Sequence, residues 1–142
     1  MRKLIVVIVG VSVLAAALSA FDSGPSLVGE WKGSGAKTVE SMQKAGMIKK
    51  GVNIEHMIGR LSETTYIFTK DTLKLAIDSG PYLGDGYVSY EVTDRTDNSI
   101  SISLYVTPDD KHFTTYYFTE DGQCIYTEQE NYKDFFCKPN GY

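Results

Sequence analysis

The chain has two histidines, and the residues beside each decide whether it can do chemistry. His112 follows Asp109 and Asp110, and His56 follows Glu55, so either group holds residue types that ligate metal ions. Neighbouring residues on a helix point to different sides, however, and carboxylates in turns are ordinarily solvated. No Gly-x-Ser-x-Gly elbow, which would point to a serine hydrolase, occurs in the sequence. We therefore expect no metal site and no serine-hydrolase chemistry.

Pairs of acidic residues are a second group that could act in catalysis. Glu128 and Glu130 have the composition of a glycosidase acid pair, but acidic residues beside turns usually face solvent. The run Gly84-Asp85-Gly86 is too short to cradle a phosphate and leads into a strand pattern rather than a helix. These observations predict a protein that is not an enzyme and needs no cofactor.

The only two cysteines, Cys124 and Cys137, lie close together near the C-terminus. They do not form the Cys-x-x-Cys motif that is typical of a redox site. An isolated pair in an oxidising compartment is typical of a disulfide. A bond that closes so short a loop stabilises a domain by about 3 kcal/mol. We expect this disulfide to join two neighbouring strands.

Residues 1–20 have the pattern of an export signal. Arg2 and Lys3 are followed by uncharged apolar or small residues over 4–18 and by small residues up to Ala20. Residues 4–20 are at the short end of the roughly 17–25 residues that span a bilayer, and no basic cluster follows them. We expect cleavage near Ala20, a linker over 21–26, no stable membrane anchor, and a periplasmic or secreted protein.

The charge of the chain argues against anionic partners. The chain has 14 basic and 18 acidic side chains and a formal net charge of −4, and removal of the leader makes the remainder more acidic. The lysines and arginines form no stripe, so nucleic acid and anionic membrane surfaces are poor partners.

Residues 27–142 are enough for a single domain with its own core.

The hydrophobic pattern after the linker predicts a mainly β domain. Residues 27–33 have the pattern of a strand, 36–50 that of a helix, and Asn53 can cap a second short helix containing Ile54 and Leu61. The period then becomes two, which predicts strands over 64–69, 72–78, 88–92, 100–106, 112–119, 124–128 and 132–138. Turns such as those at 94–98 and 108–111 join them. We expect an antiparallel meander curled into a barrel or half-barrel, with one or two short helices after the first strand.

The motif Gly29-Glu30-Trp31, together with a meander of tyrosine- and phenylalanine-rich strands, resembles the opening of lipocalin-like (calycin-type) barrels. This resemblance implies that Trp31 closes one end of the barrel and that a basic side chain from the last strand, Lys138 or Lys133, stacks on it. The helical segment after the first strand departs from the lipocalin order, in which the helix comes late. The resemblance implies that a helix in this place caps or plugs the barrel.

Two functions from different classes follow from this fold. The first is a non-enzymatic binding protein that holds a small apolar ligand in a cavity of about 300 Å³ or more. The residues expected to line that cavity are inward-facing aromatics: Trp31, Tyr66, Phe68, Tyr90 and Phe118.

The second is a protein-binding module, such as an inhibitor or immunity protein of an exported enzyme. It would use a rigid exposed patch of acidic residues and tyrosine rings, around residues 82–87 or in the 108–112 loop.

Overall fold

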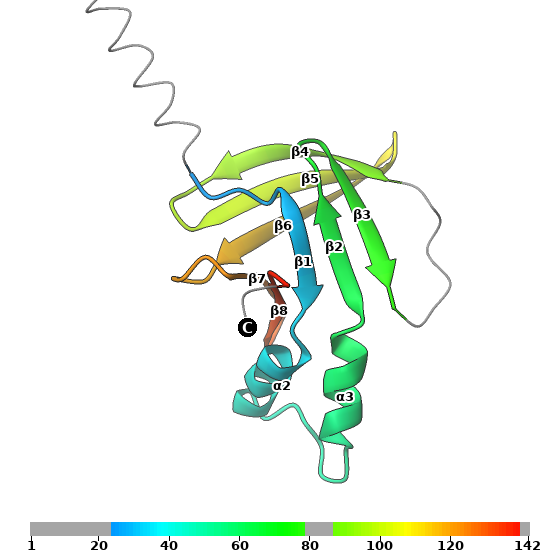
Figure 1. The fold of residues 1–142 in the computed structure, drawn as a ribbon, viewed down its shortest axis with the longest axis vertical. Coiled ribbons are helices and arrows are strands. Elements are labelled where there is room, and N and C mark those ends of the chain that lie inside the picture. Colours follow the sequence, from blue (N-terminus) through cyan, green and yellow to red (C-terminus); the bar gives the residue numbers. More distant parts are fainter. Residues whose placement is uncertain (1–23, 79–86, 140–142) are drawn as a thin grey trace, which may run out of the picture.

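A computed structural model of the 142-residue chain describes residues 24–78 and 87–139. Within these ranges eight strands form a closed antiparallel barrel, in which each strand pairs with its neighbours in sequence and the last pairs back to the first (Figure 1). The strands are β1 (Gly29–Gly33), β2 (Thr64–Phe68), β3 (Thr72–Ile77), β4 (Val88–Arg95), β5 (Ser99–Thr107), β6 (Asp110–Phe118), β7 (Cys124–Glu128) and β8 (Lys133–Cys137). The predicted mainly β barrel is confirmed. The expected leader and most of the expected linker lie outside the described residues, as does Tyr82.

The helices between β1 and β2 are α2 (Gly35–Lys44) and α3 (Ile54–Leu61), and both lie at one end of the barrel (Figure 1). As predicted, Asn53 caps α3, because its side-chain oxygen accepts a hydrogen bond from the His56 N–H at 3.1 Å. The prediction of one helix over 36–50 was wrong at its C-terminal end. Gly46 has a φ of +69°, a conformation that ends a helix, so α2 stops at Lys44.

Two turns are shorter than predicted. β4 continues to Arg95, into the segment expected to turn at 94–98, and its register shifts between Val92 and Asp94. β6 already begins at Asp110, inside the turn expected at 108–111. Both strands therefore extend further than their alternating residues indicated, because a β-bulge lets a strand continue past an interruption in its pattern.

The core of the barrel is aromatic and aliphatic. Trp31 is 1% exposed, and its indole N–H donates a hydrogen bond to the Leu27 carbonyl at 2.7 Å. The Phe68 ring meets the Tyr90 and Tyr116 rings edge to face, each with 5.6 Å between centroids. Other members of this cluster are Leu73, Ile100, Ile102, Ile125 and Phe136. Side chains from all parts of the meander thus fill this part of the interior.

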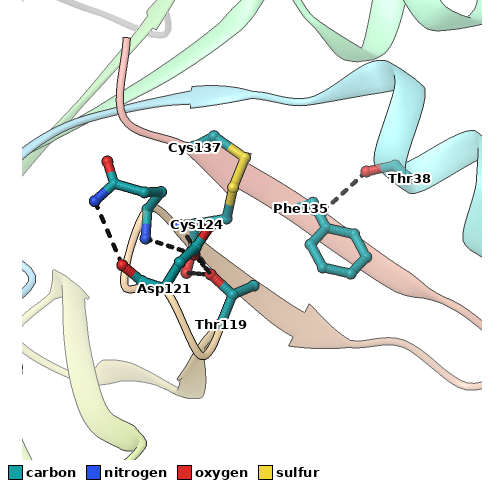
Figure 2. Close-up of a disulfide and its surroundings, with 7 residues drawn as sticks. Thr38, Thr119, Asp121, Cys124, Phe135 and Cys137 are labelled. Atoms are coloured by element: carbon teal, nitrogen blue, oxygen red, sulfur yellow. Dashed lines mark hydrogen bonds between the residues drawn. A yellow bond between two sulfur atoms is a disulfide. The ribbon is translucent and has the colours of Figure 1, made fainter. Parts of the chain in front are cut away.

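Beyond the end of β1, helix α2 lies beside β8. β1 pairs with β8 only at Lys32 and Gly33, and from there the helix supplies the hydrogen-bonding groups. The Ser34 N–H donates to the Phe135 carbonyl at 2.8 Å. The Phe135 N–H donates to Thr38 Oγ1 at 2.9 Å (Figure 2). Further along the helix, Ser41 Oγ accepts from the Lys133 N–H at 2.8 Å. The helix therefore satisfies a strand edge that would otherwise lack partners.

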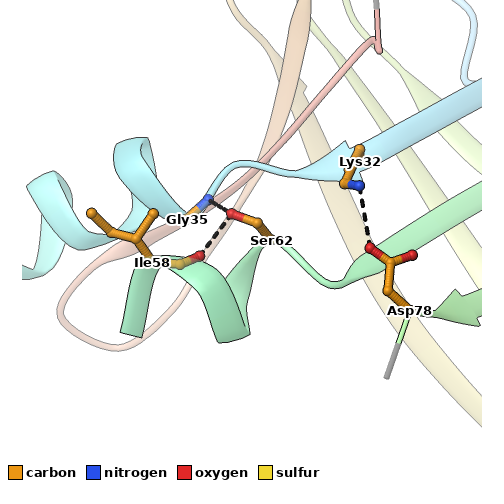
Figure 3. A network of polar contacts seen from close by, with 5 residues as sticks. All are labelled: Lys32, Gly35, Ile58, Ser62 and Asp78. Atoms are coloured by element: carbon orange, nitrogen blue, oxygen red, sulfur yellow. Dashed lines mark hydrogen bonds and ion pairs between the residues drawn. The ribbon is translucent and has the colours of Figure 1, made fainter. Parts of the chain in front are cut away.

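Helix α3 packs closely on the start of α2. The Gly35 N–H donates to Ser62 Oγ at 3.0 Å, and that hydroxyl donates to the Ile58 carbonyl at 2.7 Å (Figure 3). A Cβ atom at Gly35 would collide with the Ile58 carbonyl oxygen, so the approach of the two helices requires glycine here. Nearby, Lys32 of β1 and Asp78 after β3 form an ion pair at 3.2 Å (Figure 3).

The predicted disulfide between Cys124 and Cys137 is confirmed, and the two cysteines are directly opposite each other on β7 and β8. Figure 2 shows the turn before β7, in which Asp121 accepts hydrogen bonds from the Thr119 hydroxyl at 2.7 Å and from the Gln123 N–H at 3.0 Å. The bond from Thr119 is the main cause of the lowered pKa of Asp121. The last hairpin is thus held both by a covalent bond and by an ordered turn.

Candidate functional site

A cavity of about 910 Å³ opens into the barrel, and every strand from β2 to β8 contributes to its wall. Its apolar wall comes mostly from β3, β4 and β5 and consists of Leu73, Leu75, Val88, Leu104, Val106 and Phe113. The cavity exists because β6 and β7 pair only at Tyr117↔Tyr126 and Phe118↔Ile125. The earlier part of β6 and the end of β7 therefore border the cavity on opposite sides.

Two tyrosine hydroxyls reach this cavity without a partner. Tyr66 of β2 and Tyr116 of β6 both line it, and Tyr116 is only 3% exposed. Neither hydroxyl forms a hydrogen bond with any of residues 24–78 and 87–139. Among the described residues, Ser103 Oγ is the single fully buried side-chain oxygen or nitrogen without a hydrogen-bond partner, so both phenol oxygens are accessible and free to bind a ligand.

A carboxylate faces the same space. Asp134 lies two residues before the buried Phe136 on β8, so both side chains point inward. The cross-strand partner of Asp134 on β7 is Thr127. Its Oδ1 accepts a hydrogen bond from Thr38 Oγ1 at 3.2 Å, whereas no hydrogen bond within the described chain reaches Oδ2. Burial raises the pKa of Asp134, and the Thr38 hydrogen bond only partly opposes this.

The charge of the cavity wall is entirely negative. Glu128 at the end of β7 is the second carboxylate of the lining, and among the described residues no lysine, arginine or histidine lines the cavity. Burial, and in second place the charge of Asp134, raises the pKa of Tyr66 to about 12. Burial also raises the pKa of Tyr116, with smaller contributions from Tyr66 and Asp134. At neutral pH both phenols are protonated and can donate or accept hydrogen bonds.

The structure places the five aromatic residues predicted to line a ligand cavity in or against one cluster. Tyr66 lines the 910 Å³ cavity, and its ring lies 4.4 Å from that of Phe136. The other four, Trp31, Phe68, Tyr90 and Phe118, lie in the packed part of the barrel rather than in the wall of the cavity.

Sequence reasoning missed Tyr116 and Asp134 as site residues. Strand alternation was the available signal for both, because Tyr116 precedes an outward-facing residue and Asp134 shares the face of Phe136. An acidic residue on the inward face of a strand is rare enough to mark a site.

The two lysines considered as partners of Trp31 lie on different sides of the barrel wall. The ammonium of Lys138 is 5.5 Å from the centre of the Trp31 ring. Lys133 instead lies over Tyr126, at 4.8 Å from the ring centre. Tyr126 belongs to an outer row of rings, stacked on Tyr117 and tilted on Phe135, so these aromatics pair across strands.

Neither histidine lines the cavity, although His112 lies opposite Leu104 and next to Phe113, which do. His112 Nε2 lies 3.3 Å from Asp110 on an exposed surface, and His56 is exposed on α3. Within the described ranges, no three histidine, cysteine, aspartate or glutamate side chains gather as a metal site would require. None of the helices in these ranges is long and apolar enough to cross a membrane.

Comparisons with known proteins add no family to these observations: no protein-family model, no curated protein and no solved structure matches the chain. The candidate site therefore has to be interpreted from its own geometry and chemistry.

Proposed function

We propose that this protein is a non-enzymatic binding protein that holds a small ligand with an apolar body in the open part of its barrel. The observation that carries the proposal is the cavity of about 910 Å³, which has an aliphatic wall and a small number of inward polar groups. Small-molecule sites are typically concave, mostly apolar and about 300–1,000 Å³ in volume. A barrel used only as a scaffold would gain stability by filling this space.

The test is binding of the uncharged dye Nile red to the purified protein and to a variant with a filled cavity. Thr114→Phe adds a ring to the cavity wall, whereas Thr93→Phe adds the same ring at an exposed position of β4 that does not line it. We expect Thr114→Phe to reduce dye affinity by about tenfold or more, and Thr93→Phe to leave it unchanged. Equal binding by all three proteins would refute the proposed site.

The finer assignment to lipocalin-like barrels also belongs to this proposal. It is supported by Gly29-Glu30-Trp31 on β1, by the closed meander, and by the position of Lys138 over the Trp31 ring. Export is proposed on the leader pattern of residues 1–20 and is supported by the Cys124–Cys137 bond, since disulfides persist mainly in oxidising compartments. Edman sequencing of the protein recovered from culture supernatant or periplasm tests this; an intact Met1 there would contradict cleavage.

A second candidate, a protein-binding module for an exported enzyme, is favoured by one observation. Phe113 is 74% exposed beside a part of β6 that has a strand partner on one side only among the described residues. Exposed aromatic rings are common anchors of protein interfaces. Affinity capture from the exported fraction, with the wild type and Phe113→Ser, tests it. A partner retained equally by both proteins, or no partner, would contradict this use of Phe113.

A further inference from the structure

We infer that the cavity selects an organic cation, specifically a primary amine carried on an apolar body, in preference to a neutral lipid or a fatty acid. This inference rests on the proposed ligand-binding function and specifies the class of ligand. It comes from three observations on the cavity wall: its charge, its unpaired polar atoms and its apolar surface.

The charge of the cavity wall favours a ligand with a positive charge. Asp134 points into the cavity, and Glu128 borders it from the outward face of β7, opposite Lys133; no basic side chain of the described residues lines the cavity. A fatty acid or a phosphate ester would place a further negative charge beside these carboxylates. An ammonium group would instead compensate Asp134, whose ionised form is disfavoured by burial in the empty barrel.

The unpaired polar atoms select the chemical group. Asp134 Oδ2 and the hydroxyl oxygens of Tyr66 and Tyr116 all belong to residues of the cavity wall, and none has a hydrogen-bond partner in the described chain. Three acceptors suit a primary ammonium, which carries three N–H donors and no acceptor. Tyr116 is 3% exposed, so its hydroxyl can reach little except what occupies the cavity.

The opposite side of the cavity selects an apolar body. Leu73, Leu75, Val88 and Leu104 present aliphatic surface from β3, β4 and β5. A small polar amine would leave this surface uncovered. An alkyl or aryl amine would bury it, at about 25 cal/mol for each Å² removed from water.

The test compares four ligands with the same ten-carbon chain, titrated calorimetrically into the purified protein: decylammonium, decyltrimethylammonium, decanol and decanoate. We expect decylammonium to bind about tenfold or more tighter than decanol, since a charged hydrogen bond replaces a neutral one. Decanoate should bind most weakly. The quaternary cation should bind more weakly than the primary amine, because it has no N–H to donate.

Asp134→Asn is the decisive variant, because its amide keeps an acceptor for Thr38 but loses the charge. It should reduce the preference for decylammonium over decanol to within about threefold. Asp97→Asn is the matched control, since it removes the same charge from an exposed turn between β4 and β5. Tyr116→Phe is a second variant, which removes one acceptor and keeps the ring in the core.

The outcomes separate the two proposals. Decanol and decylammonium binding equally well, or decanoate binding tightest, would overturn the amine assignment and leave the ligand-binding function in place. Equal affinity for the primary and quaternary cations would overturn the role of the three acceptors. Failure of all four ligands to bind, together with failure of Nile red, would overturn the ligand-binding function itself. Loss of amine preference in Asp97→Asn as well as Asp134→Asn would show that net charge, rather than the cavity, is responsible.

Discussion

The hydroxyl of Thr38 donates a hydrogen bond to Asp134 Oδ1 at 3.2 Å. The same hydroxyl accepts a hydrogen bond at 2.9 Å from the backbone N–H of Phe135, the residue after Asp134. One side chain of α2 therefore both completes the barrel wall and holds the carboxylate that faces the cavity. The support of the fold and the arrangement of the candidate site are physically linked at this residue.

Removing the Thr38 hydroxyl should destabilise the protein. Thr38→Val has nearly the same shape but leaves the Phe135 N–H without its acceptor, and Thr38 is 1% exposed. We expect a loss of about 1–3 kcal/mol in the free energy of unfolding, measured by urea denaturation. Thr38→Ser keeps the hydroxyl and should lose less. A smaller loss in Thr38→Val than in Thr38→Ser would show that the methyl group, rather than the hydroxyl, matters here.

Two glycine substitutions in the helical segment should have opposite effects. At Gly35 an added Cβ meets the Ile58 carbonyl, so Gly35→Ala should reduce the free energy of unfolding by about 1–3 kcal/mol. Gly59 lies within α3 with open space around its Cα, so Gly59→Ala should raise it by about 0.5–1 kcal/mol. Thermal unfolding of both variants measures this. A stabilising Gly35→Ala would contradict the close packing of α3 on α2.

The disulfide should stabilise the barrel by restricting the unfolded chain. Reduction, or the double variant Cys124→Ser with Cys137→Ser, should lower the free energy of unfolding by about 3 kcal/mol. Denaturation with and without dithiothreitol gives the value, and the double variant serves as the control because the reductant should not affect it. An unchanged unfolding midpoint on reduction would mean that the hairpin turn alone holds β7 and β8 together.

Asp134 should make the empty barrel less stable at neutral pH than at acidic pH. Burial raises its pKa in the folded state, and the groups that face it are Thr38 and the phenols of Tyr66 and Tyr116. A carboxyl with a raised folded-state pKa favours folding below its unfolded pKa, and this contribution is lost as pH rises through the folded pKa.

Asp134→Asn removes this titration. The free energy of unfolding of the variant minus that of the wild type should therefore increase as pH rises from about 4 towards about 7. Denaturant titrations without ligand measure this difference. Parallel pH profiles for the two proteins would contradict a raised pKa at Asp134. A variant that is more stable when empty yet binds amines less well would be consistent with a residue kept for binding.

The alternation of residues along the chain was sufficient to predict most of the barrel. Ile100 and Ile102 alternate with serines and were assigned to a strand, and both are buried in β5. Strand positions are local properties of the sequence, which is why they could be predicted.

The cavity could not be predicted in the same way, because it depends on how far neighbouring strands remain paired. β6 and β7 separate beyond Tyr117 and Tyr126, and Tyr66 lines the cavity while Phe68, on the same strand, lies in the packed core. The contact of α2 with β8 could not be predicted from the sequence either. Ser34, Thr38 and Ser41 are spaced along a helix, but nothing in that spacing indicates a strand as their partner.

Chemical-shift mapping by NMR tests the central claim, that the open part of the barrel is a ligand site, most directly. Decylammonium would be added to the purified protein with labelled leucine and valine methyl groups. We predict saturable shifts confined to methyl groups of the cavity wall, such as those of Leu75, Val88 and Leu104, with no change at the exposed Val28. Shifts scattered over the surface, or none at the cavity wall at saturating ligand, would contradict the site.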